Sequence, residues 1–170
     1  TDVPAQNLAI GVFDQPLGGW QVQVEGEPIS VNNIKFNLIL GENLGGTIGL
    51  DINDVNYSKL VDENGKVLAG PVDAVGSGLS GTALTFVDKI VFPIGVTNIK
   101  LVGRMAAGTA AFESNATAQV VTKPSSQWTS TGTLTGVSIT PSPDSAVSGP
   151  IMTGKDAAAV TSVKVTPTNP

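Results

Sequence analysis

Short runs in which apolar and polar residues alternate recur along the first half of the chain. An alternation with a period of two residues is typical of a strand that buries one face. Four such runs cover residues 8–12, 20–25, 34–40 and 48–52. Turn-forming residues end the last three of them: Gly26-Glu27-Pro28, Gly41-Glu42-Asn43 and Asn53-Asp54. The pattern therefore predicts short β-strands joined by turns.

A hairpin is predicted between residues 59 and 72. Leu60-Val61 and Val67-Leu68 flank Asp62-Glu63-Asn64-Gly65. Asn-Gly is a strong hairpin signal because both residues tolerate a positive φ. Further strands are predicted at 83–87, 90–92, 98–105, 118–122, 134–140 and 161–166. Pro93 predicts a strand end or an edge position, because proline cannot donate a hydrogen bond to a β-ladder.

Regularly spaced turns predict an all-β protein, a β-sandwich of Ig-like or jelly-roll-like type with antiparallel sheets and little or no helix. The Ala-rich segments 105–112 and 155–160 are the two helix candidates, and both are too short to be stable alone. Two Ser/Thr/Pro/Gly-rich segments, 123–130 and 140–150, are expected to be linkers or crossings between sheets. A single domain over 1–170 is favoured over two subdomains, because 134–166 has too few apolar residues for its own core.

Composition agrees with this prediction and narrows the function. Only 14% of the residues are charged, and the net charge is −5 with 9 basic residues, too few for the clustered positive charge that nucleic acid requires. The chain has no run of 18 apolar residues, so direct insertion into a membrane is not expected. It contains no Cys and no His, which removes disulfides, zinc–thiolate sites and the commonest general base. The Cys-free composition and the weak negative charge favour an extracellular or cell-surface location in a bacterium or archaeon.

An enzymatic role is not expected. Without His or Cys, a nucleophile would need a Ser–Lys or carboxylate arrangement, and neither a helical Ser-x-x-Lys nor a Gly-x-Ser-x-Gly motif is present. Carboxylate pairs could form among five acidic residues near strand ends, but such residues usually belong to solvated turns. The five are Glu25, Glu27, Glu42, Asp51 and Asp54.

Calcium is the one cofactor for which the sequence offers candidate ligands. Asp51, Asn53 and Asp54 supply hard oxygen atoms at the end of a predicted strand, and Asp62 and Glu63 are further candidates near the next loop. Their spacing lacks the glycine and terminal glutamate of an EF-hand. The alternative is that these side chains cap turns through their own backbone.

Two segments match the N-glycosylation pattern, Asn56-Tyr57-Ser58 and Asn115-Ala116-Thr117. Asn115 lies in a predicted loop and is the better acceptor, whereas Asn56 lies in a predicted strand. Trp128 lies in the polar segment 125–130, which predicts an exposed aromatic ring able to bind a sugar or contact a neighbouring module. Trp20 alternates with Val22 and is expected in the core.

Three segments carry a resemblance to a known class of protein. They are Val31–Phe36, Asp54–Val67 with its Asn-Gly turn, and Phe86–Val96 with its Ile90-Val91-Phe92-Pro93-Ile94-Gly95 step. They resemble the tandem, Ig-like β-sandwich modules of large secreted, S-layer-like surface proteins of uncultivated bacteria. The resemblance covers roughly residues 5–140 and rests on turn motifs. It implies a repeat or subunit of an assembly and carries no catalytic residue over to this chain.

We therefore expect a structural module of an extracellular assembly, such as an S-layer, stalk or filament, held by edge-strand pairing and apolar contacts. Its partners would be copies of itself or adjacent modules of the same protein. Residues 159–170 are expected to form a terminal strand and exit segment that pairs with or leads to a neighbouring module, or else an ordinary last strand. The alternative function is a carbohydrate-binding or adhesive module, with glycans as partners.

Overall fold

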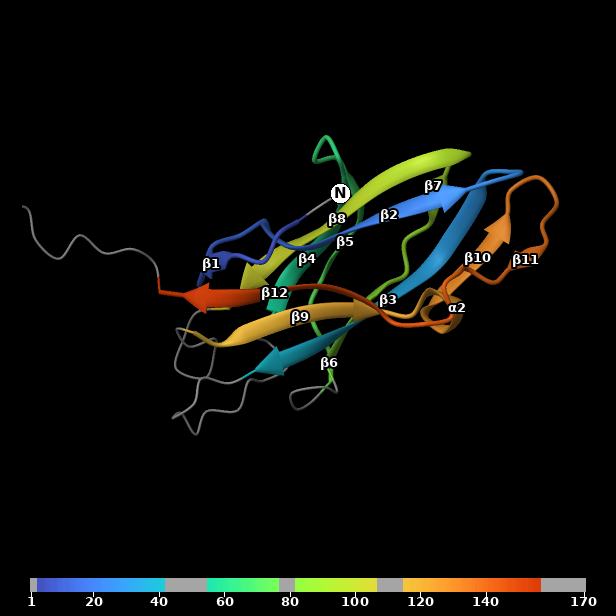
Figure 1. Cartoon of the computed structure of the whole chain (residues 1–170). Coiled ribbons are helices and arrows are strands. Elements are labelled where there is room, and N and C mark those ends of the chain that lie inside the picture. The colour runs from blue at the N-terminus through green and yellow to red at the C-terminus, as the bar shows by residue number, and fades with distance from the viewer. Residues whose placement is uncertain (1–2, 42–54, 77–81, 107–114, 157–170) are drawn as a thin grey trace, which may run out of the picture.

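Two β-sheets pack face to face in the computed structural model, which describes residues 3–41, 55–76, 82–106 and 115–156 (Figure 1). The all-β, sandwich-like fold predicted from the sequence is confirmed. In these ranges the helical content is one four-residue turn, α2 (Pro124–Gln127). None of the described helical structure is long and apolar enough to cross a bilayer.

The larger sheet is organised around β3 (Ile29–Gly41), whose apolar side chains Ile34, Phe36, Leu38 and Leu40 are all buried. Two strands pair with one side of β3 and two with the other. The order is β1-β12-β9-β3-β10-β11, and all pairs are antiparallel except β1 with β12. The strands around β3 are β1 (Asn7–Ala9), β6 (Thr82–Phe86), β7 (Ile90–Phe92), β9 (Thr117–Thr122), β10 (Trp128–Gly132), β11 (Ser138–Ile139) and β12 (Val147–Lys155).

The smaller sheet has four antiparallel strands in the order β2-β8-β4-β5. They are β2 (Gln15–Val24), β4 (Val55–Asp62), β5 (Val67–Val72) and β8 (Gly95–Met105). β8 and β4 are therefore internal, and β2 and β5 are the two edges of this sheet.

The predicted hairpin is formed by β4 and β5, and its turn depends on Asp62 as well as on Gly65. The Asp62 side chain accepts hydrogen bonds from the amides of Asn64 and Lys66, both at 2.9 Å. Gly65 has a φ of 83°, whereas Asn64 is not in the left-handed region. The turn therefore needs one left-handed residue and not the two that the Asn-Gly pattern suggested.

The core between the sheets is built on Phe36. Its ring centroid lies 4.8 Å from that of Trp20, and it makes edge contacts with Phe86 and Trp128. Glycines let the first half of β2 approach β12 closely: a Cβ on Gly18 would lie 2.6 Å from Cη2 of Trp20, and one on Gly149 would lie 3.5 Å from Cζ2 of the same ring. The two sheets consequently touch along the first half of β2.

The strands predicted near 83, 90, 98 and 118 are found as β6, β7, β8 and β9, and β7 ends just before Pro93 as expected. The strand predicted at 134–140 is present only as the two residues of β11. The linker or crossing predicted at 123–130 is wrong in part, because this segment contains α2 and the start of β10. β12 lies mostly beyond the crossing predicted at 140–150 and was missed because Gly149, Pro150 and Gly154 interrupt its alternation. A register shift between Ser148 and Ile151 accommodates that Gly-Pro step. The strands predicted at 48–52 and 161–166, and most of both helix candidates, lie outside the described residues, although Met105 ends β8 and Lys155 ends β12.

Candidate functional site

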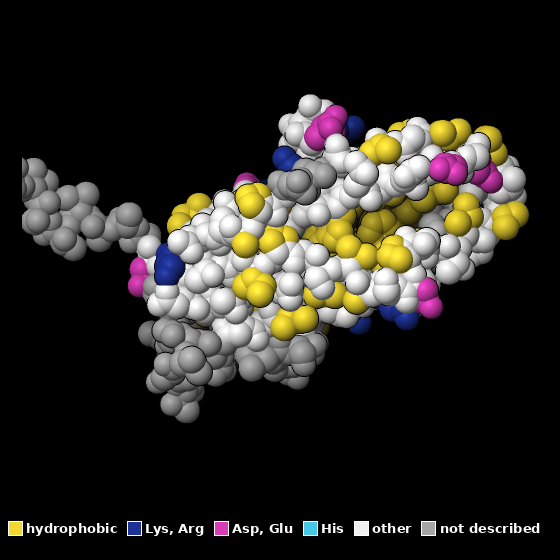
Figure 2. Space-filling model, in the orientation of Figure 1, with side chains coloured by type: hydrophobic (Ala, Val, Ile, Leu, Met, Phe, Trp, Pro, Cys, Tyr) yellow, Lys and Arg dark blue, Asp and Glu magenta, His cyan; other side chains and the backbone are white. Residues whose placement is uncertain are grey.

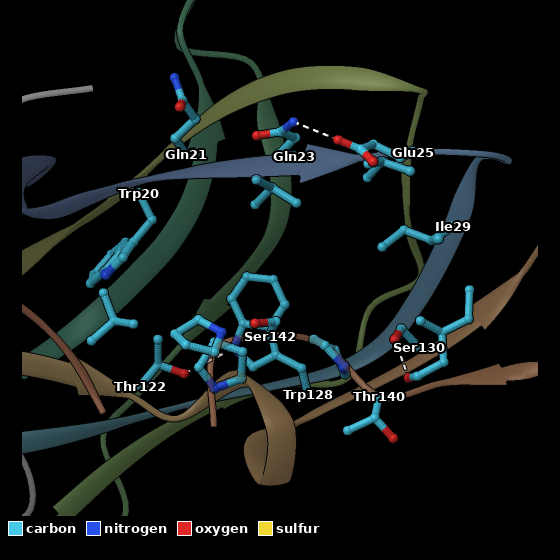
Figure 3. Close-up of a pocket in the computed structure, with 17 residues that line it drawn as sticks. Trp20, Gln21, Gln23, Glu25, Ile29, Thr122, Trp128, Ser130, Thr140 and Ser142 are labelled. Atoms are coloured by element: carbon cyan, nitrogen blue, oxygen red, sulfur yellow. Dashed lines mark hydrogen bonds between the residues drawn. The ribbon is translucent and has the colours of Figure 1, made fainter. Parts of the chain in front are cut away.

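A cavity of about 300 Å³ opens between the two sheets beside the second half of β2 (Figure 3). One wall is formed by six consecutive residues, Trp20 to Glu25. The opposite wall is formed by Trp128 and by residues 139–143, with Ile29 and Val147 also in the lining. We refer to this cavity as the inter-sheet groove. Hydrophobic side chains are visible inside this hollow in the space-filling view (Figure 2).

The groove exists because β2 is covered along only half of its length. Among the described strands, β8 alone pairs with β2, from Gln15 to Val24. β12 packs against the first half of β2 where Gly149 meets Gly18, and the second half borders the cavity. Val24 is buried and Val22 is half-buried, and both side chains belong to the face of β2 that packs on the other sheet. Gln21 and Gln23 are exposed, and they point away from the cavity in Figure 3. The groove therefore has an apolar interior beside an open strand edge.

Trp128 is half-buried, in contrast to the exposed ring expected from its polar sequence context. Pro124 begins the turn α2, and the Trp128 amide donates to the Pro124 carbonyl at the end of that turn. The indole Nε1 donates to Oγ1 of Thr122 at 2.9 Å. This bond and the edge contact with Phe36 hold the ring against the core, so that Trp128 forms part of the groove wall.

Titratable groups are sparse at the groove. Among its described lining residues, Glu25 is the one charged side chain, and it accepts a hydrogen bond from Nε2 of Gln23 at 2.9 Å. Glu27 instead binds the turn after β10. The Thr135 hydroxyl donates to its carboxylate at 2.6 Å and the Leu134 amide at 2.7 Å, and these bonds hold the pKa of Glu27 below its ordinary value. The groove thus offers apolar surface and hydrogen-bonding groups.

The two glycosylation candidates differ in access. Asn56 is half-buried in β4, and the Ser58 side chain of the same motif is fully buried. Asn115 is exposed at the turn before β9, with a φ of 75°, and its side-chain oxygen accepts a hydrogen bond from Nζ of Lys155. In the folded chain Asn115 is therefore the more accessible of the two.

The calcium candidates Asp51, Asn53 and Asp54 lie outside the described residues. Within the described ranges no three acidic side chains come together at a position that could hold a metal ion. The nearby Asp62 is engaged in the β4–β5 turn, and Glu63 accepts a hydrogen bond from Asn98 at 3.3 Å.

An exposed aromatic cluster was not anticipated from the sequence. Phe13 and Tyr57, each about half exposed, make an edge contact with ring centroids 5.1 Å apart, and the Arg104 guanidinium lies 4.7 Å from the Phe13 centroid. Tyr57 has a φ of 51°, which is unusual for a bulky residue and places it in a bulge of β4. No linear pattern joins residue 13 to residue 57, so this cluster could be found only in the folded chain.

Among the described residues, the inter-sheet groove and the aromatic cluster are thus the two surface features that offer apolar or aromatic binding surface. Comparison of the chain with models of known families, with curated proteins and with solved structures finds no match.

Proposed function

We propose that this chain is a structural building block of an extracellular assembly on a bacterium or archaeon, joined to its neighbours through the β2 edge and the apolar groove beside it. The observation that carries the proposal is the long, uncharged, open edge of β2. A strand edge presents unpaired N–H and C=O groups, which are a template for pairing with another chain. Proteins that remain monomeric usually protect such edges.

The other edges in the described residues are short or interrupted. β1 and β7 have three residues each, β11 has two, and β6 has five and is bridged at Ala83 by Val75. β5 contains Gly70-Pro71, and the part of β12 that β1 leaves unpaired contains Pro150. β2 has ten residues, and from Gly18 to Val24 it contains neither a charge nor a proline. Short length, proline and charge are among the devices that prevent edge-to-edge association. This stretch of β2 has none of them, and its position beside an apolar groove adds a driving force for association.

A carbohydrate-binding or adhesive module is the second candidate, favoured by the exposed rings of Phe13 and Tyr57 and by Trp128 in the groove. Sugars stack on exposed aromatic faces. The planes of Phe13 and Tyr57 meet at 68°, so the two rings do not form one flat platform, and Trp20 in the groove is only 8% exposed. These geometries support assembly more strongly than sugar binding.

The experiment combines electron microscopy and sedimentation velocity on the purified chain, with and without millimolar calcium. We expect sheets, filaments or concentration-dependent oligomers. The variant Gln21→Lys/Gln23→Lys adds charge to two exposed positions of β2 and should abolish association without unfolding the chain. Val67→Lys, at an exposed position of the other edge strand β5, is the matched control and should assemble normally.

A strictly monomeric chain in every condition would refute the proposal, as would equal association by the β2 and β5 variants. A response to calcium would point to residues 51–54. In the monomeric case, binding of glycans to the chain and its loss on Trp128→Ala would support the carbohydrate-binding alternative.

A further inference from the structure

We infer that the strand that pairs with β2 is the segment 160–166 of a neighbouring copy, which enters the inter-sheet groove with Val163 and Val165 directed inward. This inference rests on the proposed function and specifies both surfaces of the contact. It makes the assembly head-to-tail, with the groove of one copy receiving the chain that leaves the next.

The segment 160–166 reads Val-Thr-Ser-Val-Lys-Val-Thr. In an extended conformation Val163 and Val165 share one face and Lys164 lies on the other. Next to β2, the two valines would continue the inward row that contains Val22 and Val24. Side chains on the same face of neighbouring strands are in contact, so pairing would extend the apolar row of β2 by one strand.

The outward face of the segment matches the rim of the groove in charge. Lys164 would lie on the face that carries Gln21, Gln23 and Glu25, and Glu25 is the one charged lining residue described. With Val163 opposite Val24 and Val165 opposite Val22, Lys164 lies opposite Gln23, and Glu25 is its diagonal neighbour within reach of the long lysine side chain. The groove has a volume of about 300 Å³. That space suits a few branched side chains and is too small for a folded element.

The length of the connecting chain favours the groove of a neighbour over the groove of the same copy. Val147 lines the groove, and Lys155 is eight residues further along β12, a distance of roughly 27 Å at 3.3–3.4 Å per residue. Val163 is eight residues beyond Lys155, and a reversal uses at least about two of these. The remaining six residues span roughly 20 Å. If the chain turned back on its own copy, Val163 would therefore not reach the level of Val147, and Val24 would also be out of its reach.

The directions of the strands make a neighbour the natural recipient. In Figure 1, β12 runs away from the groove end and finishes at the opposite end of the molecule, and β2 runs in the opposite sense to β12. A chain that continued along β12 into a translated copy would meet that copy's β2 in antiparallel orientation. Such a contact is heterologous and does not close, so that it generates a filament.

Engineered cysteines test the contact directly, because the chain has no cysteine of its own. The full chain carries Lys164→Cys together with either Gln23→Cys or Gln21→Cys, two outward positions that allow for a shift of register. Lys164→Cys with Val67→Cys, on the β5 edge, is the matched control. Each protein is oxidised mildly and separated on a denaturing gel with and without reductant.

We expect a ladder of covalent multimers from a β2 pair, its disappearance with reductant, and at least tenfold less multimer from the β5 control. A cross-linked monomer would overturn the inference, because it would place the segment in its own groove. Equal ladders from all pairs, or no ladder from either β2 pair, would also overturn it.

The variant Val163→Asp/Val165→Asp separates this inference from the proposed function. We expect the variant to keep the circular-dichroism spectrum of the parent chain and to sediment as a monomer under conditions in which the parent assembles. If the variant assembles like the parent, the segment is not the donor strand, although the building-block function stands. If the parent itself never assembles, the proposed function and the inference both fail.

Discussion

Gly18→Ala tests the packing that brings the two sheets together beside the groove. The φ of Gly18 is not in the left-handed region, so alanine can adopt its backbone conformation. The added Cβ, however, would lie 2.6 Å from Cη2 of Trp20 and 3.2 Å from two further ring atoms. The indole would have to move by roughly 1 Å to restore an ordinary contact distance. Phe36, at 4.8 Å between ring centroids, restricts that movement.

The expected cost follows from two opposing terms. Overpacking a well-filled core costs about 1–3 kcal/mol. Replacing glycine by alanine reduces the entropy of the unfolded chain and contributes about 0.4–1 kcal/mol in the other direction. Gly18→Ala should therefore lower the free energy of unfolding by about 1–2 kcal/mol. In the background of Trp20→Phe the outer ring atoms are gone, so the same change should be neutral or stabilising by up to about 1 kcal/mol.

The assay is urea unfolding of the four proteins of this double-mutant cycle. Circular dichroism is the appropriate signal, because Trp20→Phe removes one of the 2 tryptophans that fluorescence would report. A coupling energy of about 1–3 kcal/mol between the two positions is expected. A cost of Gly18→Ala that is the same in both backgrounds would refute the steric reasoning, and so would a wild-type-like Gly18→Ala.

Three further predictions concern single residues. The folded-state pKa of Glu27 is below its unfolded value, so its contribution to stability is present above the unfolded pKa and is lost as the pH falls through the folded pKa. In urea unfolding at a series of pH values, Glu27→Gln should therefore show a smaller loss of unfolding free energy than the parent chain between about pH 7 and about pH 3. The same loss in both proteins would contradict this prediction. Trp128→Phe removes the hydrogen bond from Nε1 to Thr122, so the free energy of unfolding, measured by urea unfolding, should fall by about 0.5–1.5 kcal/mol. A gain in stability would contradict the role of that bond. Gly65→Ala places an alanine at a φ of 83°, and no atom lies within 4 Å of the new Cβ. The change should lower the free energy of unfolding by about 1–2 kcal/mol through backbone strain alone, which thermal unfolding would show as a fall in Tm of roughly 2–8 °C. An unchanged Tm would contradict this prediction and mean that the turn relaxes.

Much of the fold could be predicted from local pattern because strands with one buried face leave a direct signal. Trp20, Val22 and Val24 alternate with polar residues, and the strand is found there. The β4–β5 hairpin was predicted from Asn64-Gly65, although the details of its turn depend on the Asp62 side chain. The strand of β12 was hidden because its glycines and proline carry no apolar signal, and partner strands supply its pairing.

The candidate site was much less accessible to sequence reasoning. Trp128 lies among polar residues, and only the turn at Pro124 and the bond to Thr122 direct its ring into the groove wall. The contact between Phe13 and Tyr57 joins positions far apart in the chain and depends on the unusual backbone of Tyr57.

The sequence by itself determined the all-β class, the inward and outward faces of individual strands and the main hairpin, because alternation and turn chemistry act between residues a few positions apart. The tertiary structure decided which strands pair, which edge remains open and where the sheets separate. Those features depend on contacts between distant segments, such as the approach of Gly149 to Gly18, which covers the first half of β2 and leaves the second half beside the groove.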